Sequence, residues 1–253
     1  MPKIINNNAN PIIVIGDSHA MGWGVNDDET FSYILQNILK RQVYNLAVSS
    51  YGTMREIIRL NKTNLLRNSN ILLKNININK TRDGILKALN LMNANIEIFN
   101  IKTLNNENVA DMNISYSQLK GCHLNADMAK YMIDEYPILA IAASFADSPS
   151  LFKGLSELKV KESNRLELIR KNLVNCGVYC EVNNDELYID PRKKTEFKNN
   201  LIQTDFDHRI AMSFAIMGSC MKEDLKIMDS KSINTSFPTF INSFNQAGGN
   251  LIE

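Results

Sequence analysis

Charged side chains are concentrated between Lys161 and Arg165, directly before a segment with helical periodicity. These five residues carry two cations and one carboxylate, and the apolar residues from Leu166 onward repeat at the spacing of a helix face. Free backbone N–H groups at a helix start favour an anion, and a guanidinium can bind a carboxylate or phosphate through two parallel hydrogen bonds. The pattern indicates an anion site at a strand-to-helix junction. The charge pattern alone favours a simpler alternative, a solvated first helical turn.

Two more polar clusters stand at the starts of predicted helices. Asp207, His208 and Arg209 precede an apolar pattern of helical spacing. Asp134 lies shortly before Pro137, which the first turn of a helix tolerates because its N–H groups have no partner within the helix. A carboxylate at such a position can serve only to balance the helix dipole. Three polar clusters therefore open predicted helices.

The overall composition excludes several classes of protein. The formal net charge of the 253 residues is +1, so the balance predicts no binding to nucleic acid or to an anionic membrane. No apolar run approaches the ~20 residues that cross a bilayer, and no secretory signal is visible, so we expect a cytoplasmic protein. The four cysteines and three histidines show no metal-ligand spacing. This predicts buried thiols in a reducing compartment, with no metal site and no cofactor.

The first 60 residues have the pattern of the opening of a doubly wound α/β fold, β-α-β-α. An apolar, largely β-branched run at 11–15 predicts a strand buried in a parallel sheet, and a second strand is expected at 43–48. The stretches VIGDSHAMGWGV and YNLAVSSYGT resemble the first two sequence blocks of the SGNH (GDSL-type) hydrolases. The resemblance implies that Ser18 is a nucleophile and that Gly52 helps to form an oxyanion hole.

Two further blocks of that hydrolase family, Gly-x-Asn-Asp and a C-terminal Asp-x-x-His, have no match in the sequence. A serine hydroxyl is a poor nucleophile without a positioned base. Residues 1–60 are therefore interpreted as a truncated, catalytically empty hydrolase-like segment, followed by a junction at 61–70.

A different architecture is predicted for residues 71–253. The predicted strands are 71–78, 109–115, 119–123, 178–182, 186–189 and 225–228, and a strand is also expected before Lys161. Predicted helices cover 81–92, 125–146 and 239–247, and two more follow Arg165 and Arg209. A polar loop is expected at 191–200.

The segment LKVKESNRLELIRKNLVNCGVYCEV closely resembles the VKESDR segment of the 5-enolpyruvylshikimate-3-phosphate (EPSP) synthases. The stretches NKTRDGILKALNLMNANIEIFN, IDEYPILAIAASFA, DHRIAMSFAI and TSFPTF match further motifs of that family in the same order. Asn93 replaces a usual Gly after the first helix, and Asn tolerates the positive φ that ends a helix there.

The resemblance implies a fold and a pair of substrates. In this family two similar domains, each built from three β-α units, close on shikimate 3-phosphate and phosphoenolpyruvate. Residues 71–253 resemble nearly all of the C-terminal half, whereas the N-terminal half has no match in the sequence. A separate chain is therefore a candidate partner that would supply it.

The resemblance also assigns catalytic residues. Asp134 would face the hydroxyl of shikimate 3-phosphate, and Glu162 would act as acid or base near the methylene carbon of phosphoenolpyruvate. Lys161 would bridge the two substrates. Carboxylates with separate roles suit this chemistry, because neighbouring cations can keep one of them ionised.

The implied substrate-binding residues are Arg165, Asp207, His208 and Arg209. The two arginines would bind phosphoenolpyruvate, and His208 would line the phosphate. Thr235 stands where some members have a phosphate-binding lysine, which predicts weaker phosphate binding.

Three functions stay open at this point. The first is an enolpyruvyl transferase fragment that needs its other half, and the second is an ester hydrolase that uses Ser18. The third is a non-catalytic domain that binds phosphorylated metabolites.

Overall fold

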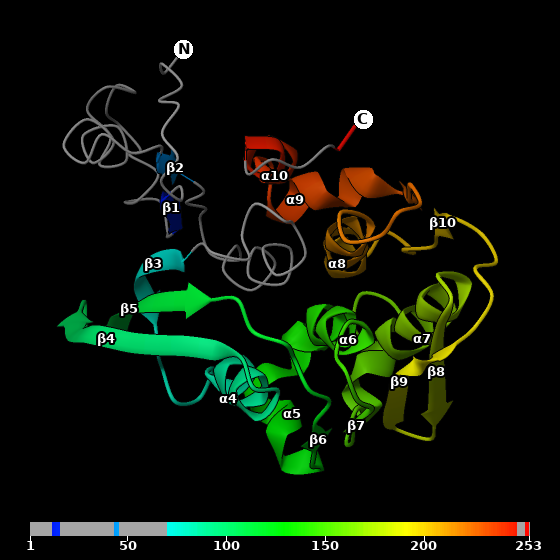
Figure 1. Ribbon diagram of the computed structural model, residues 1–253, viewed down its shortest axis with the longest axis horizontal. Helices are drawn as coiled ribbons and strands as arrows, with labels where there is room; N and C mark the ends of the chain where they lie inside the picture. The colour runs from blue at the N-terminus through cyan, green and yellow to red at the C-terminus, as the bar shows by residue number, and fades with distance from the viewer. Residues whose placement is uncertain (1–11, 16–42, 46–69, 247–250, 253) are drawn as a thin grey trace. The chain divides into compact units, whose positions relative to one another are not determined.

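The computed structural model describes residues 12–15, 43–45, 70–246 and 251–252 (Figure 1). They form two compact units. Unit 1 contains the described residues of 1–79, 95–116 and 239–253, and unit 2 contains residues 80–94 and 117–238. Ser18, Gly52, the helices expected among the first 60 residues and most of the predicted junction lie outside the described residues.

Among the described residues, unit 1 is built on a five-stranded sheet in the order β2-β1-β3-β5-β4. Its strands are β1 (Ile12–Ile15), β2 (Val43–Asn45), β3 (Asn70–Asn77), β4 (Asn95–Leu104) and β5 (Glu107–Ser115), and it also contains helix α10 (Phe240–Gln246). Strand β1 pairs in parallel with β2 and β3, whereas β5 is antiparallel to β3 and β4. Strands from both predicted segments, 1–60 and 71–253, therefore belong to one sheet. Separate folding of the two predicted segments stays a prediction.

Unit 2 contains a four-stranded sheet in the order β6-β7-β9-β8 and a small parallel pair, β10 with β11. The strands are β6 (His123–Leu124), β7 (Ser150–Phe152), β8 (Val178–Asn183), β9 (Glu186–Lys194), β10 (Leu201–Ile202) and β11 (Lys226–Ile227). The α-helices are α4 (Gly84–Leu91), α5 (Ala129–Met132), α6 (Tyr136–Ser144), α7 (Arg165–Asn175), α8 (His208–Gly218) and α9 (Ile233–Ser236). Short 3-10 helices are η2 (Ala126–Met128), η3 (Ile133–Glu135), η4 (Ser156–Val160) and η5 (Ser230–Ser232).

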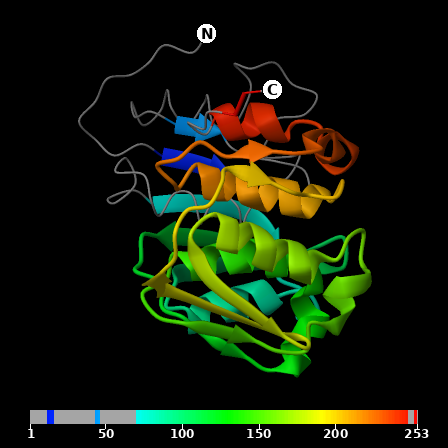
Figure 2. The ribbon, with the colours of Figure 1, turned by 90° about the vertical axis from the view of Figure 1, so that its right-hand side faces the viewer.

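Helix α6 lies at the centre of unit 2. All of its residues are buried, and it contacts α7, α8 and β9. A helix that is apolar on every side belongs in a core. Helix α7 packs against β8, and Figure 2 shows it running along the β8–β9 hairpin. Pro137 lies in the first turn of α6, as predicted, so the residues just before it are held at the edge of the core.

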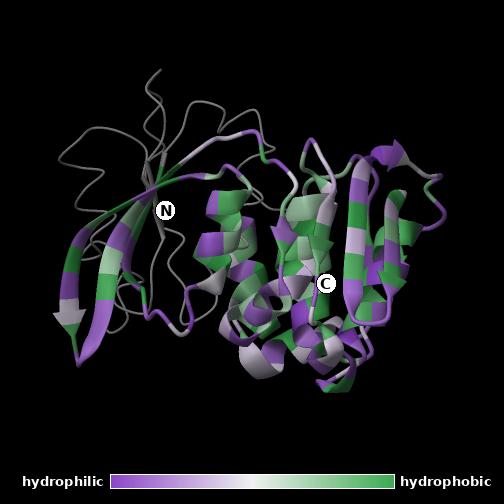
Figure 3. Ribbon diagram, turned by 90° about the horizontal axis from the view of Figure 1, so that it is seen from below, coloured by the Kyte–Doolittle hydropathy of each residue, from purple (hydrophilic) through white to green (hydrophobic). Residues whose placement is uncertain are grey.

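The strands of the hairpin alternate in polarity (Figure 3). Leu187 and Ile189 of β9 are fully buried, whereas Tyr188 between them is partly exposed. This period of two is the pattern from which strands at 178–182 and 186–189 were predicted. Asn93 has a positive φ of 64° just after α4, which confirms it as the residue that ends this helix.

Several predicted elements are wrong in extent or type. Of the predicted 119–123 strand only His123 lies in a strand, β6, because the preceding N–H groups bond elsewhere: that of Cys122 donates to Ser150 Oγ and that of Lys120 donates to the Met92 carbonyl. The predicted 125–146 helix is divided into η2, α5, η3 and α6. Strand β9 continues to Lys194, so the predicted loop begins later.

The predicted strand before Lys161 is the 3-10 helix η4. Leu158 turns into the core and is fully buried, while Val160 is exposed. A strand would place Leu158 and Val160 on one face, whereas this turn separates them, so the apolar spacing of the two residues misled the prediction. Strands β4, β7 and β10 are not among the predicted elements. The mixed α/β class is as predicted.

Candidate functional site

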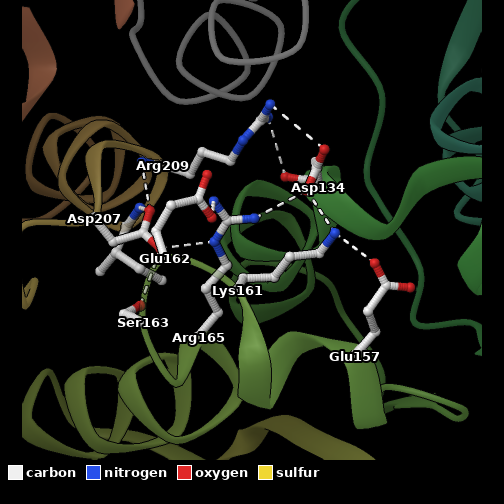
Figure 4. Close-up of polar contacts among 9 residues, drawn as sticks. Asp134, Glu157, Lys161, Glu162, Ser163, Arg165, Asp207 and Arg209 are labelled. Atoms are coloured by element: carbon white, nitrogen blue, oxygen red, sulfur yellow. Dashed lines mark hydrogen bonds and ion pairs between the residues drawn. The ribbon is translucent and has the colours of Figure 1, made fainter. Parts of the chain in front are cut away.

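Three helix starts in unit 2 bring the predicted site residues together (Figure 4). Asp134 lies in η3, just before α6. Lys161 and Glu162 lie between η4 and α7, and Arg165 is the first residue of α7. Arg209 is in the first turn of α8. In Figure 4 the polar ends of these side chains point toward one another.

Local capping explains why two of these helices begin where they do. Asn164 is the N-cap of α7, and its Oδ1 accepts a hydrogen bond from the Glu167 backbone N–H at 3.2 Å. Asp207 is the N-cap of α8, and its Oδ1 accepts from the N–H groups of Arg209 at 2.9 Å and Ile210 at 3.4 Å. Asn and Asp are preferred caps because a short side-chain oxygen reaches these orphan donors.

The guanidinium of Arg165 is the centre of the cluster. Its side chain is 0% exposed and contacts three carboxylates. Nε donates to Asp207 Oδ2 at 2.7 Å, Nη1 donates to Asp134 Oδ1 at 3.0 Å and Nη2 donates to Glu162 Oε2 at 2.5 Å. Burial alone would lower the pKa of Arg165, but the hydrogen bond to Asp207 and the three negative charges raise it. A buried charge is tolerated when it is paired and hydrogen-bonded in this way.

Asp134 lies among three cations. Besides its contact with Arg165, its Oδ1 is 3.8 Å from Lys161 Nζ and its Oδ2 is 3.7 Å from Arg209 Nη2. Burial would raise the pKa of Asp134, but the charges of Arg209, Lys161 and Arg165 outweigh it and lower the pKa. Asp134 is therefore ionised at neutral pH.

Asp207 is enclosed on every side. It is 0% exposed, and its Oδ2 accepts from Ser163 Oγ at 3.0 Å as well as from Arg165. Because Oδ1 accepts from the α8 backbone and Oδ2 accepts from Arg165, this carboxylate links the start of α8 to Arg165. That geometry suits a residue that positions Arg165 and Arg209, and the direct substrate contact that the family resemblance implies for Asp207 stays a prediction.

His208 follows at the start of α8 and is half-buried. Burial lowers its pKa, and the nearby charges of Arg209 and Arg165 act in the same direction against those of Asp207 and Glu162. The imidazole is therefore neutral at pH 7 and can both donate and accept a hydrogen bond.

Two residues of the cluster are absent from the predicted site. Glu157 Oε1 lies 2.5 Å from Lys161 Nζ, one helical turn earlier in the chain. Ser163 bonds to Asp207 across 44 positions of sequence. The spacing of four between Glu157 and Lys161 was a usable signal for the first, whereas nothing local indicates the second.

Thr235 stands on α9, and its hydroxyl donates to the Ser232 carbonyl at 2.7 Å. The hydroxyl is therefore engaged within its own turn.

The described residues contain no group of three or more metal-ligating side chains. The four cysteines are free thiols, and burial raises the pKa of Cys122 to about 11 and the pKa values of Cys176 and Cys180 to about 12. None of the helices in the described part of the chain is long and apolar enough to span a membrane.

The family model of EPSP synthase (3-phosphoshikimate 1-carboxyvinyltransferase) matches residues 63–244. The chain belongs to the EPSP synthase family. A 3-phosphoshikimate 1-carboxyvinyltransferase of Bartonella quintana is 40% identical over 188 residues, which are 74% of this chain and 42% of that protein. Its counterpart in Paramagnetospirillum magneticum is 40% identical over 187 residues, with the same coverage of 74% and 42%. The chain thus spans about 42% of the length of these EPSP synthases.

Solved structures show the same relationship. An EPSP synthase from Acinetobacter baumannii matches with a TM-score of 0.69 and 31% identity, over 84% of this chain and 48% of that chain. The enolpyruvyl transferase NikO from Streptomyces tendae matches with a TM-score of 0.57 at 12% identity, over 83% of this chain and 45% of that chain. The second likeness concerns the fold alone.

Proposed function

We propose that this chain supplies the C-terminal half of a 3-phosphoshikimate 1-carboxyvinyltransferase active site. In that reaction the enolpyruvyl group of phosphoenolpyruvate passes to a hydroxyl of shikimate 3-phosphate, and phosphate is released. The observation that carries the proposal is the cluster in which Arg165 joins Asp134, Glu162 and Asp207 from three separate helix starts. Family membership and the order of the motifs support it.

The reaction proceeds by addition and elimination. The hydroxyl oxygen bonds to the central carbon of phosphoenolpyruvate while a proton is added to the methylene carbon, which becomes a methyl group. The bond between that central carbon and the phosphate oxygen then breaks, and a proton leaves the methyl group to restore the double bond. The site needs one group that accepts the hydroxyl proton, one that exchanges a proton with carbon, and cations around the phosphate and carboxylate.

In this scheme Asp134 faces the hydroxyl of shikimate 3-phosphate, and Glu162 exchanges a proton with the methylene carbon of phosphoenolpyruvate. Asp134 is ionised, so it can accept a hydrogen bond from the hydroxyl at neutral pH. Substrate anions beside Arg165 and Lys161 would offset their charge, which would raise the pKa of Asp134 and make it a stronger base. Glu162 is half-exposed, as a group that must reach a substrate should be.

Cations complete the scheme. Lys161 would bridge the two substrates, and Arg165 and Arg209 would bind phosphoenolpyruvate. Neutral His208 would line the phosphate, where it can donate one hydrogen bond. Asp207 would act through Arg165 and Arg209, since its own carboxylate is enclosed.

The other half of the site belongs, in this proposal, to a partner that supplies the N-terminal half of the family fold. Closure of the two halves would exclude water, which strengthens every charged contact with the substrates. The partition into a hydrolase-like segment at 1–60, a junction at 61–70 and a transferase domain at 71–253 is part of the proposal, as is the cytoplasmic location.

The test is release of phosphate from phosphoenolpyruvate and shikimate 3-phosphate. We expect no turnover with the chain alone, and turnover when the separately expressed N-terminal half of a relative is added. With both halves present, Glu162→Gln should lower kcat by roughly 100-fold or more, the usual contribution of a general acid or base. Glu167→Gln, in the first turn of α7, should leave kcat unchanged.

Two outcomes contradict the proposal. Turnover by the chain alone would refute the half-site, and equal effects of Glu162→Gln and Glu167→Gln would remove Glu162 from the chemistry.

A further inference from the structure

The three carboxylates around Arg165 differ in how easily each can leave it. Asp207 is 0% exposed and bonds to Ser163 and to the α8 backbone as well. Asp134 is held by Lys161 and Arg209 in addition to Arg165. Glu162 is 52% exposed, lies three residues from Arg165 and contacts it through a single oxygen. Glu162 therefore loses fewer contacts than Asp134 or Asp207 when it leaves Arg165.

The cluster has no excess of positive charge without any ligand. Its cations are Lys161, Arg165 and Arg209, and its carboxylates are Asp134, Glu157, Glu162 and Asp207. An anion that arrives at Arg165 therefore meets a guanidinium whose Nε, Nη1 and Nη2 each already donate to a carboxylate. Because the Arg165 side chain is 0% exposed, an anion from solution can reach the guanidinium only where it displaces a carboxylate.

We propose that Glu162 is an internal ligand of Arg165, which a substrate carboxylate or phosphate displaces from Nη2. This inference rests on the proposed function and adds to it an order of events. While Arg165 holds Glu162, the carboxylate is engaged with a cation and cannot serve as an acid or base elsewhere. Binding of an anionic oxygen to Nη2 releases the side chain, so the proton-transfer group becomes free only when a substrate anion is in place.

The chain offers a matched control for this idea. Glu167 and Arg170 of α7 form an ion pair with the same spacing of three, and Glu167 is 47% exposed. Arg170 lies outside the cluster around Asp134, and its own side chain is 35% exposed. Glu162→Gln and Glu167→Gln each remove one negative charge and keep the shape of the side chain. Only the first removes a competitor from Arg165.

The experiment measures binding of inorganic phosphate to the full chain by isothermal titration calorimetry at low salt, for wild type and both variants. We expect Glu162→Gln to bind phosphate about fivefold to tenfold more tightly, because tenfold corresponds to the ~1.4 kcal/mol that an ion pair with a charged hydrogen bond can contribute. Glu167→Gln should change the affinity by less than about twofold, since its charge is distant and screened.

Unchanged or weaker phosphate binding in Glu162→Gln would overturn the inference, and so would an equal gain in both variants, which would report net charge alone. Phosphate binding needs no turnover, so failure of this test leaves the transferase proposal standing. Conversely, loss of the transferase proposal through the turnover assay would not alter the measured competition at Arg165.

Discussion

Replacement of Asp207 by Asn should reveal how much of the stability of unit 2 depends on the buried charge of Arg165. The substitution keeps an oxygen that can cap α8, so the N-cap contribution is largely retained. It removes the negative charge that faces Nε of Arg165 at 2.7 Å, at a position where both side chains are 0% exposed. Loss of one partner from a buried ion pair typically costs ~3–5 kcal/mol. Because Arg165 keeps Asp134 and Glu162, we expect a loss near the lower end, ~3 kcal/mol.

Asp190→Asn is the matched control. Asp190 is only 2% exposed and, like Asp207, accepts four hydrogen bonds, but its partner Arg192 is 59% exposed. The arginine can return to water when the charge is removed, so the expected cost is ~1 kcal/mol or less. The measurement is urea unfolding at pH 7, followed by far-UV circular dichroism. Equal losses in the two variants, or a loss below ~1 kcal/mol for Asp207→Asn, would refute the argument that the burial of Arg165 sets the cost.

Three more predictions follow from the same residues and from the N-terminal segment. Asp134 and Asp207 have lowered pKa values in the folded chain. Their contribution to stability should therefore be complete above about pH 3.9 and lost as the pH falls through the lowered values. Urea unfolding at several pH values checks this, and an Asp207→Asn chain with the same acid dependence as wild type would contradict it. Residues 71–253 should keep most of their circular dichroism signal without residues 1–60, because β1 pairs with β3 over only three residues. Cooperative loss of structure in the shortened chain at room temperature would show instead that β1 is essential. Short acyl esters should be hydrolysed no faster by the chain than by its Ser18→Ala variant, since no base block matches, and a Ser18-dependent rate above background would argue for the hydrolase.

The starts of the site helices can be recognised from local sequence signals. Asn164 and Asp207 cap α7 and α8, Pro137 marks the start of α6, and Asn93 ends α4. Each of these signals acts within about four residues along the chain, so it can be recognised without knowledge of the fold. The VKESNR motif is local in the same sense, and together with the other motifs in the same order it indicated the family.

The contacts among those helix starts, by contrast, depend on tertiary packing. The burial of Arg165 depends on Asp134 and Asp207, which lie 31 and 42 positions away in the sequence. The local pattern predicts a solvated arginine at a helix start, because it contains no information on which distant segment will cover that side chain. The same reason hides the enclosed position of Asp207, the bond from Ser163 and the pairing of β1 with β3 across the predicted junction. Burial and pairing of this kind arise when segments far apart in the sequence pack together, and they depend on the tertiary fold.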